Sequence, residues 1–478
     1  MPPPETEPVA LIVGKIYLTA LGSRSPPKTA VLLFDTITAV ANFASVPLRA
    51  LTIDFNSFFA SVEQQERPEL RGQPVGIVAV LAETTGCIAV SIEAKQMGLA
   101  RNLRVAEARR LVPQFQMVES RPETYIGYHR RLVEVIESCV HVTKVQSIDE
   151  VTCELKGRWA EPERALALAG QIKNKIQREI GPCLRSSIGL APNWLLAKVA
   201  SDMQKPDGLI LLDDADLPGK LLHLSPGEIT GIGPNLERRL HEHGIDTMAQ
   251  LYAASMTEFR GIWHSVRGEQ MWRLLHGEDI PFFEEKGDKT IGHGHVLPPQ
   301  LRNDPSALAV LHRLLQKAAM RLRDSGLYTG MLHLSLQYRD EAHWGGELAF
   351  NETQDTLTLT HALNQLWTKR PKELHGRAPL KVGVMLLKLL RGEAHTPDLF
   401  GATQEKSRDR LHAAVDQINR TLGKNSVYFG GAHGATHYAP MRIAFTRIPK
   451  PELEEIDSSL ERRIRPKKKE APADWEND

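Results

Sequence analysis

The chain has 478 residues, more than one hydrophobic core usually supports, so we expect several domains. Its 42% hydrophobic and 24% charged residues are ordinary for a soluble globular protein. The formal net charge of +1 excludes nucleic-acid binding by the surface as a whole, so such a partner would need local basic patches. No apolar run approaches the ~18 residues of a membrane span, and no membrane partner is expected.

Four cysteines are scattered along the chain without a CxxC pair: Cys87, Cys139, Cys153 and Cys183. They predict reduced, buried thiols of a cytoplasmic protein, not a zinc site or a disulfide framework. Residues 1–47 begin with Met-Pro-Pro-Pro and lack a basic start followed by an apolar core, so they do not predict a signal peptide. This N-terminal extension is of unknown role.

A carboxylate at position 54 lies where a predicted strand changes into a predicted helix. Leu51 and Ile53 recur at the period of a short strand that delivers Asp54 to its end. Phe58 and Val62 then recur at helical spacing, so the chain turns from strand into helix just after the carboxylate.

A second acidic pair, Asp149 and Glu150, falls at a predicted hairpin turn between strand-like segments Val142–Gln146 and Val151–Leu155. Two strand ends of one sheet could bring three carboxylates together, and an all-oxygen cluster suits Mg²⁺. Two such ions stabilise the attacking and leaving oxygens of a phosphoryl transfer. The alternative is that Asp54 only caps a helix and that the acidic pair is a polar turn.

Three stretches resemble motifs of the Y-family (translesion) DNA polymerases. Asp54–Glu63 and Ser147–Glu150 look like the two acidic motifs of that family, and Ile188–Gly208 is similar to a third. The motifs occur in the family's order, and the resemblance extends from about Leu48 to about Leu390. It implies a multidomain α+β fold, a right-hand polymerase with palm, fingers and thumb plus a little-finger domain.

The implied domains are an N-terminal extension (1–47), palm (48–65 and 114–212), fingers (66–113), thumb (213–288), little finger (289–391), a C-terminal region (392–449) and a disordered basic tail (450–478).

The resemblance also implies a template-directed DNA polymerase that extends a primer 3′-end without proofreading. Asp54, Asp149 and Glu150 would be its catalytic residues and would bind two Mg²⁺ ions, with the backbone carbonyl of Phe55 completing one ligand shell. Phe59 aligns with the steric gate, an aromatic ring that fills the space of a ribose 2′-hydroxyl and so selects deoxynucleotides. Core packing at the helix start is the alternative for this ring.

Four residues are expected to contact the incoming dNTP: Phe58, Phe59, Lys95 and Lys205. Relatives usually have a tyrosine and an arginine where this chain has Ile92 and Lys95. Ile92 cannot hydrogen-bond through its side chain, and Lys95 is a point charge where a guanidinium would bind in a bidentate manner. This departure weakens the expectation of triphosphate binding but leaves the expected metal site untouched.

Gly231 and Gly233 predict a helix-hairpin-helix whose backbone N–H groups face a DNA phosphate. Arg238 and Arg239 follow, and together the four residues would contact primer–template DNA without base specificity. A plain helix–helix turn is the alternative.

The pattern after residue 289 is strand–helix–strand–strand–helix–strand, the order expected of the little finger. Asp304 and Pro305 predict the N-cap and first position of its first helix. One face of this helix is apolar. The other face is basic, and because a solvated charged face is usual in any protein, its residues alone indicate little about function: His312, Arg313, Lys317, Arg321 and Arg323.

The segment His395–Gly401 resembles a sliding-clamp-binding peptide, in which Leu399 and Phe400 would fill an apolar pocket, although such a pair is often only a local packing anchor. Residues 425–447 are similar to the C-terminal region of UmuC-like members of the family. Between these segments a predicted amphipathic helix carries one apolar stripe: Leu411, Ala414, Val415, Ile418 and Leu422.

Two other interpretations compete with catalysis. A non-catalytic Y-family-like adaptor could recruit a translesion polymerase to the sliding clamp, and the changed Ile92 and Lys95 favour it. The three carboxylates argue against an adaptor, because without a metal they would only repel one another. A nucleic-acid-binding repair module would explain the hairpin glycines but not the run Ser147–Glu150.

Overall fold

The computed structural model describes residues 47–283, 289–338, 340, 342–396, 402–422, 425–436, 438 and 448. The predictions for the N-terminal extension, for Leu399 and Phe400, and for the tail after residue 450 fall outside these residues. Within them, every helix is too short or too polar to cross a membrane.

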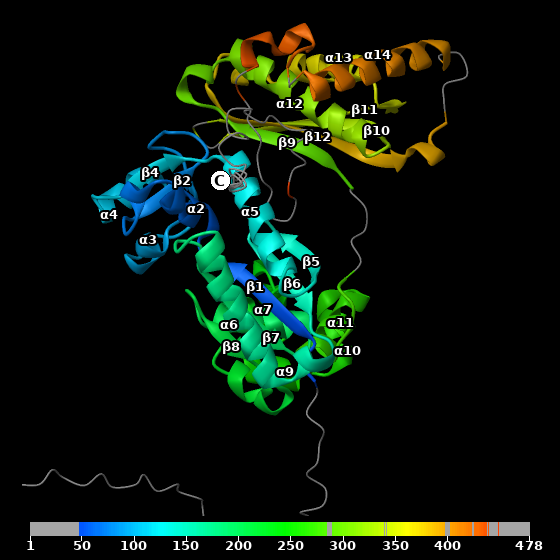
Figure 1. The fold of residues 1–478 in the computed structure, drawn as a ribbon. Helices are drawn as coiled ribbons and strands as arrows, with labels where there is room; N and C mark the ends of the chain where they lie inside the picture. Colours follow the sequence, from blue (N-terminus) through cyan, green and yellow to red (C-terminus); the bar gives the residue numbers. More distant parts are fainter. Residues whose placement is uncertain are drawn as a thin grey trace, which may run out of the picture. The chain divides into compact units, whose positions relative to one another are not determined.

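A five-stranded sheet in the order β5–β6–β1–β7–β8 has β1 as its middle strand (Figure 1). Its strands are β1 (Ala50–Phe55), β5 (Val142–Ser147), β6 (Glu150–Glu154), β7 (Ser186–Ala191) and β8 (Leu209–Leu211). Strand β1 pairs antiparallel with β6 and β7, so Leu51 and Ile53 are fully buried. Its predicted end is one residue early, because Asp54 and Phe55 still belong to the strand.

Four helices pack on this sheet: α2 (Phe58–Glu66), α5 (Pro122–Glu137), α6 (Pro162–Glu179) and α7 (Trp194–Met203). Ile188 and Leu190 of β7 share a core with α5 and α6, whereas Gly189 between them faces α7. A Cβ at Gly189 would lie 2.0 Å from the Ala197 carbonyl oxygen, so glycine is required for α7 to lie this close to β7.

A three-stranded sheet in the order β3–β2–β4 has its own small core. Its elements are β2 (Val75–Val78), β3 (Cys87–Val90), α3 (Ile92–Gln96), α4 (Val105–Leu111) and β4 (Gln116–Glu119). The basic helical pattern predicted across residues 94–110 is therefore two short helices. The turn between them includes Gly98 and Asn102, both with positive φ, which an α-helix cannot contain.

Short helices follow the five-stranded sheet, as the sequence indicated: α8 (Pro234–Glu242), α9 (Met248–Ala253), α10 (Met256–Trp263) and α11 (Val266–Leu275). They share one apolar core with α7.

The region after residue 289 has the predicted order of strands and helices. It consists of β9 (Ile291–Val296), α12 (Asp304–Asp324), β10 (Leu327–Tyr338), β11 (His343–Thr353), α13 (Thr356–Thr368) and β12 (Pro379–Arg391). The sheet order is β11–β10–β12–β9, and α12 and α13 pack on one face of it (Figure 1). The predicted cap was wrong by one residue: Asn303 accepts the Ser306 N–H, and Asp304 instead pairs with Arg370 at 2.9 Å.

The basic face of α12 is largely covered by other parts of the chain. A further helix, α14 (Ala402–Thr421), and the 3₁₀ turn η9 (Gly430–Ala435) cover it, so that Arg313 and Lys317 are buried. Arg323 forms a two-bond ion pair with Asp416 of α14. The C-terminal region thus neutralises part of the charged face of α12.

Helix α14 buries a polar face, whereas a typical amphipathic helix buries its apolar face. Its polar residues His412 and Asp416 are buried, whereas Leu411, Ile418 and Leu422 of the predicted apolar stripe are exposed. The helix docks through ion pairs and hydrogen bonds, not through its apolar stripe.

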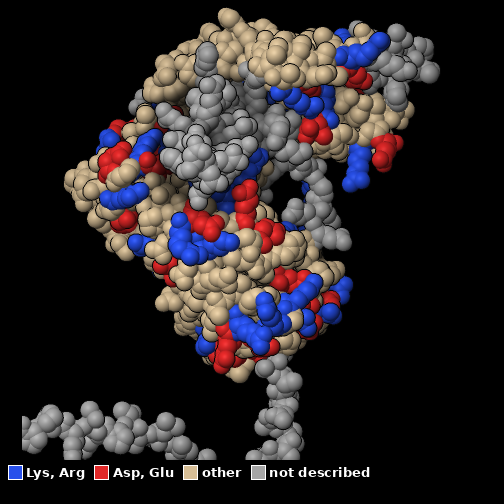
Figure 2. Space-filling view, in the orientation of Figure 1, with Lys and Arg blue, Asp and Glu red and all other residues tan. Residues whose placement is uncertain are grey.

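On the face shown in Figure 2, basic and acidic side chains of the described residues lie interspersed, in agreement with the net charge of +1.

Candidate active site

Two of the predicted catalytic carboxylates face each other across neighbouring strands. The register of β1 and β6 sets Asp54 opposite Glu150. The Lys198 Nζ atom of α7 lies 2.6 Å from Asp54 Oδ2 and 3.1 Å from Glu150 Oε2. A buried ammonium group therefore joins the two carboxylates.

The third predicted carboxylate, Asp149, lies in the turn between β5 and β6. The Ser147 hydroxyl donates a hydrogen bond to Asp149 Oδ1, and the Phe55 N–H donates one to the Asp149 carbonyl at 2.8 Å. The prediction that both acidic residues lie in the turn was wrong for Glu150, which begins β6. Among the described residues, no three side chains of metal-ligand type form a ready cation site.

A second lysine and a fourth carboxylate extend this network. The Nζ atom of Lys205, predicted to contact nucleotide, lies 2.7 Å from both Asp54 Oδ1 and Asp202 Oδ1. Asp202 also lies 3.2 Å from Lys198 Nζ. The sequence analysis missed Lys198 and Asp202 as site residues, although they stand four residues apart in the third motif and so share a helix face.

Burial and the two lysines set the charges of this cluster in opposite directions. Burial would raise the pKa of Asp54, but Lys198 and Lys205 outweigh it and hold the pKa below its usual value. For Glu150 burial prevails over Lys198 and raises the pKa to about 7. Burial likewise raises the pKa of Asp149. The cluster thus combines one carboxyl whose pKa is lowered with two whose pKa values are raised.

The donor set fits a hard cation. Asp54, Asp149 and Glu150 offer only oxygen ligands, which Mg²⁺ prefers. The Glu150 Oε1 atom is buried and accepts no hydrogen bond from the described part of the chain. A buried carboxylate oxygen is costly to leave unpaired, and a metal ligand bond would satisfy it.

A cavity of about 400 Å³ opens beside the acidic cluster. All four predicted nucleotide-contacting residues line it: Phe58, Phe59, Lys95 and Lys205. Asp54 and Asp149 line the same cavity, so two of the predicted catalytic carboxylates lie beside the predicted nucleotide-contacting residues.

The steric-gate candidate has an aromatic partner that the sequence analysis missed. Phe59 stacks on Tyr125 of α5, with ring centroids 4.4 Å apart. The Tyr125 hydroxyl donates to Glu63, which also forms two hydrogen bonds with Arg121. Phe59 therefore lines the cavity with its ring held from behind.

Ile92 and Lys95, the two departures from the family pattern, both line the cavity. Burial, together with the nearby Lys205, lowers the pKa of Lys95. Arg101, which follows α3 by a few residues, also lines the cavity. The sequence analysis did not single it out, because it lies outside the aligned position.

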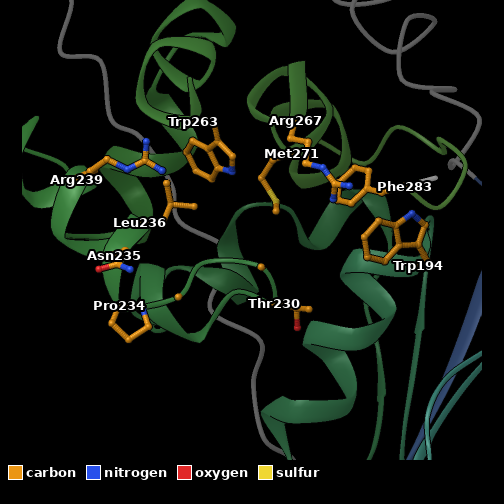
Figure 3. A pocket seen from close by; sticks show the side chains of 12 residues that line it. Trp194, Thr230, Pro234, Asn235, Leu236, Arg239, Trp263, Arg267, Met271 and Phe283 are labelled. Carbon is orange, nitrogen blue, oxygen red and sulfur yellow. The ribbon is translucent and has the colours of Figure 1, made fainter. Parts of the chain in front are cut away.

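The predicted hairpin residues Gly231, Gly233 and Arg239 line another cavity, next to the start of α8 (Figure 3). Gly231 has φ +96°, a conformation that glycine adopts readily. Arg238 does not line this cavity and instead lies 3.5 Å from Glu242 on the exposed side of α8.

Residues 53–202 match the model of the impB/mucB/samB family, and residues 288–399 match that of the family's C-terminal domain. A protein named DNA polymerase IV from Moorella thermoacetica is 33% identical over 389 residues, which cover 79% of this chain and 94% of the relative. The chain belongs to the Y family of DNA polymerases.

Two further matches agree with this family. DNA polymerase IV 1 of Bacillus subtilis is 26% identical to this chain over 388 residues, which cover 79% of this chain and 91% of the relative. A solved structure, the Y-family DNA polymerase chimera Dbh-Dpo4(243-245)-Dbh, has a TM-score of 0.59 and 22% identity, covering 72% of this chain and 99% of its own. The predicted right-hand α+β fold is confirmed, and the family supports a DNA-directed DNA polymerase of lesion-bypass type over the adaptor.

Proposed function

We propose that this polymerase adds deoxynucleotides to a primer 3′-end by two-metal phosphoryl transfer. Asp54, Asp149, Glu150 and the Phe55 carbonyl would hold two Mg²⁺ ions. When bound, the ions would lower the pKa of the primer 3′-hydroxyl and neutralise the leaving pyrophosphate. The observation that carries the proposal is that Asp54, which is paired with Glu150 across neighbouring strands, lines a cavity of about 400 Å³ together with Asp149.

The nucleotide would lie in that cavity. Lys95 and Lys205 would attract its phosphates, and Phe58 and Phe59 would contact its sugar and base. Phe59 would exclude a ribose 2′-hydroxyl by occupying its space. The Phe59 ring is 5% exposed and stacked from behind, so it has little freedom to move away.

Primer–template DNA would be held outside the catalytic sheet. Backbone N–H groups at Gly231 and Gly233, with Arg238 and Arg239, would contact phosphates without reading sequence. We assign residues 48–65 and 114–212 to the palm, 66–113 to the fingers, 213–288 to the thumb and 289–391 to the little finger, in line with the three separate sheets and the helical region.

Primer extension on undamaged DNA, with and without Mg²⁺, tests the chemistry. Asp149→Ala should abolish incorporation and leave DNA affinity within a few-fold of normal, because the proposed DNA contacts lie elsewhere. Asp216→Asn is the matched control, since Asp216 pairs with Lys220 and does not line the cavity. Equal extension by the Asp149 variant and the parent would refute the metal assignment.

The proposal of a protein partner rests on the sequence alone. Leu399 and Phe400 are proposed to bind the sliding clamp, and replacing both with alanine should remove clamp pull-down while primer extension without clamp is unchanged. Clamp binding that persists in the double variant would show that Leu399 and Phe400 only pack against neighbouring residues.

We also propose a cytoplasmic location, which is consistent with the four cysteines, all of which are free thiols.

A further inference from the structure

A cavity of about 500 Å³ in the thumb region takes no part in the proposed reaction (Figure 3). Its volume lies within the roughly 300–1,000 Å³ typical of ligand sites. Figure 3 shows Trp263 and Arg239 on one side of it, and Trp194, Phe283 and Arg267 on the other. Two aromatic walls thus stand at opposite sides, each with an arginine.

The aromatic walls are held in place by contacts outside the cavity. Trp263 stacks on Phe259, with centroids 4.9 Å apart and planes inclined by 10°. Trp194 stacks on Phe282 at 4.9 Å, and its indole N–H donates to the Ile280 carbonyl. The rings therefore present fixed surfaces, which lowers the entropy cost of binding a planar ligand.

The floor between the walls is apolar. Leu236 and Met271 line it and are almost fully buried. An ideal Cβ at Gly231 would lie 3.0 Å from Met271 Cε, so a larger residue there would press on the floor.

The rim of the cavity is cationic. Among the residues that the structure describes, no aspartate or glutamate lines it, and neither Arg239 nor Arg267 forms an ion pair. The Arg267 guanidinium lies over the Phe283 ring at 4.7 Å. By contrast, the neighbouring Arg238 has an acidic partner in Glu242. The cavity therefore favours an anionic ligand that also carries a flat apolar surface.

We propose that this cavity is a stacking site for the base of an unpaired nucleotide of the DNA substrate, with flanking phosphates at Arg239 and Arg267. The hairpin glycines that line it belong to the element proposed above for phosphate contact, so a strand held there would pass directly over the cavity. This continuity favours DNA over an acidic, aromatic peptide. The inference rests on the proposed function and extends it, because that function gives the thumb only phosphate contacts.

The test compares two labelled single strands of equal length, an oligothymidylate and an abasic oligomer with the same phosphates, by fluorescence anisotropy at one ionic strength. The parent protein should prefer the strand with bases. In Trp263→Ala that preference should fall about 5- to 150-fold, the factor for loss of one base–aromatic stack worth ~1–3 kcal/mol. Trp263→Phe keeps an aromatic ring and should retain most of the preference for the strand with bases.

Two controls separate stacking from charge and from general damage. Arg239→Gln should lower the affinity for both strands by the same factor, because both strands carry the same phosphates. Trp159→Ala removes a tryptophan that does not line the cavity but also has an arginine, Arg158, over its ring at 4.5 Å. It should leave the preference for bases unchanged.

An unchanged preference for bases in Trp263→Ala would overturn the proposal. So would Trp263-dependent binding of an acidic, tryptophan-containing peptide that DNA fails to displace, because the cavity would then belong to a protein partner. Measured in Asp149→Ala protein, the preference does not depend on incorporation. Residual polymerase activity in that variant would refute the metal assignment, whereas loss of base preference alone would refute only the stacking site.

Discussion

The ring of Phe59 stacks on the ring of Tyr125, with centroids 4.4 Å apart and planes inclined by 14°. Tyr125 is fully buried, and its hydroxyl donates to Glu63 at 2.8 Å. Arg121 also binds Glu63, through two hydrogen bonds. The proposed steric gate on α2 is thus supported by a buried polar group on α5, which leaves Phe59 little room to yield to a 2′-hydroxyl.

The first prediction concerns sugar selection. Phe59→Ala should lower the ratio of kcat/KM for dATP to that for ATP, because it empties the space of the gate. Tyr125→Leu should lower the same ratio less, since Phe59 could then tilt backwards. Tyr125→Phe keeps the stack and loses only the hydroxyl, so its ratio should stay near that of the parent. If Tyr125→Leu leaves the ratio unchanged while Phe59→Ala lowers it, the gate is held by other contacts.

The second prediction is a pH dependence of metal binding. Burial raises the pKa of Glu150 to about 7, and a carboxyl must lose its proton to bind a metal ion. The apparent affinity for Mn²⁺, a spectroscopic substitute for Mg²⁺, should therefore rise between pH 6 and pH 8, as Glu150 deprotonates around pH 7. Electron paramagnetic resonance gives this affinity without turnover. A Glu150→Gln variant should bind more weakly and lose the pH dependence, and a pH-independent affinity in the parent would contradict the assignment.

The third prediction concerns Lys198, which lies between Asp54 and Glu150. Lys198→Met should leave Asp54 paired with Lys205 alone and should remove the ion pair of Glu150. Removing one partner of a buried pair costs about 3–5 kcal/mol, so Tm in EDTA should fall by several degrees. Added Mg²⁺ should restore more of the Tm in this variant than in the parent, because a cation would replace the lost charge.

Lys220→Met is the control for this experiment. Lys220 pairs with Asp216 on the surface at 2.8 Å and should change Tm little, with or without Mg²⁺. Equal responses of the Lys198 variant and the parent to Mg²⁺ would show that Lys198 is not the countercharge of the acidic pair.

The fourth prediction addresses the changed triphosphate contacts. Arg101 lines the nucleotide cavity, and its guanidinium can supply the bidentate, charge-assisted hydrogen bonds that neither Ile92 nor the ammonium group of Lys95 can form. Arg101→Gln should raise the KM for dNTP roughly 10-fold or more at similar kcat, the equivalent of one bond worth about 1.5–3 kcal/mol. Arg104→Gln changes a nearby arginine that does not line the cavity and should leave KM unchanged.

The double change Ile92→Tyr with Lys95→Arg restores the usual family residues and should lower the KM for dNTP. It should also reduce the penalty of Arg101→Gln, since a second guanidinium would then reach the phosphates. Steady-state kinetics with all four dNTPs measures both effects. An unchanged KM in Arg101→Gln would show that Lys205 and Lys95 bind the triphosphate without it.

The fifth prediction concerns the docking of α14. Burial would raise the pKa of Asp355, but hydrogen bonds that include His412 outweigh it and hold the pKa well below its usual value. The stability from Asp355 is therefore present above the ordinary pKa of 3.8 and is lost as pH falls from there towards the folded-state pKa. Asp355→Asn should destabilise the protein at pH 7 and abolish this loss below pH 4.

Hydrogen exchange along α14 checks that prediction locally. Asp416→Asn breaks the buried pair with Arg323 and should speed exchange in α14, because the helix docks through that pair. Asp324→Asn disturbs a longer contact with Arg420, 3.5 Å apart, and should change exchange little. Equal exchange rates in the parent and in both variants would mean that other contacts hold α14 in place.

Much of the fold could be read from local patterns. The alternation in β1, the helical spacing after Asp54 and the strand–helix order after residue 289 depend on neighbours a few residues apart, so the sequence determined them. It also determined which carboxylates and aromatic rings the site would contain. Where it erred, as with the cap at Asp304 or the turn at Glu150, the error was one residue, because the ends of elements depend on hydrogen bonds that patterns do not show.

Only the tertiary structure decided which groups meet. Lys198 lies 144 positions from Asp54, and Tyr125 lies 66 positions (125 − 59) from Phe59, so no local spacing could pair them. Periodicity predicted an amphipathic helix with one apolar stripe for α14, whereas Leu411, Ile418 and Leu422 of that stripe are exposed. It counts apolar residues and cannot show that Asp416 meets Arg323 and that Asp355 meets His412. A long-range pairing of charges determined the orientation of α14, and a buried charge is stable only where its partner is already in place.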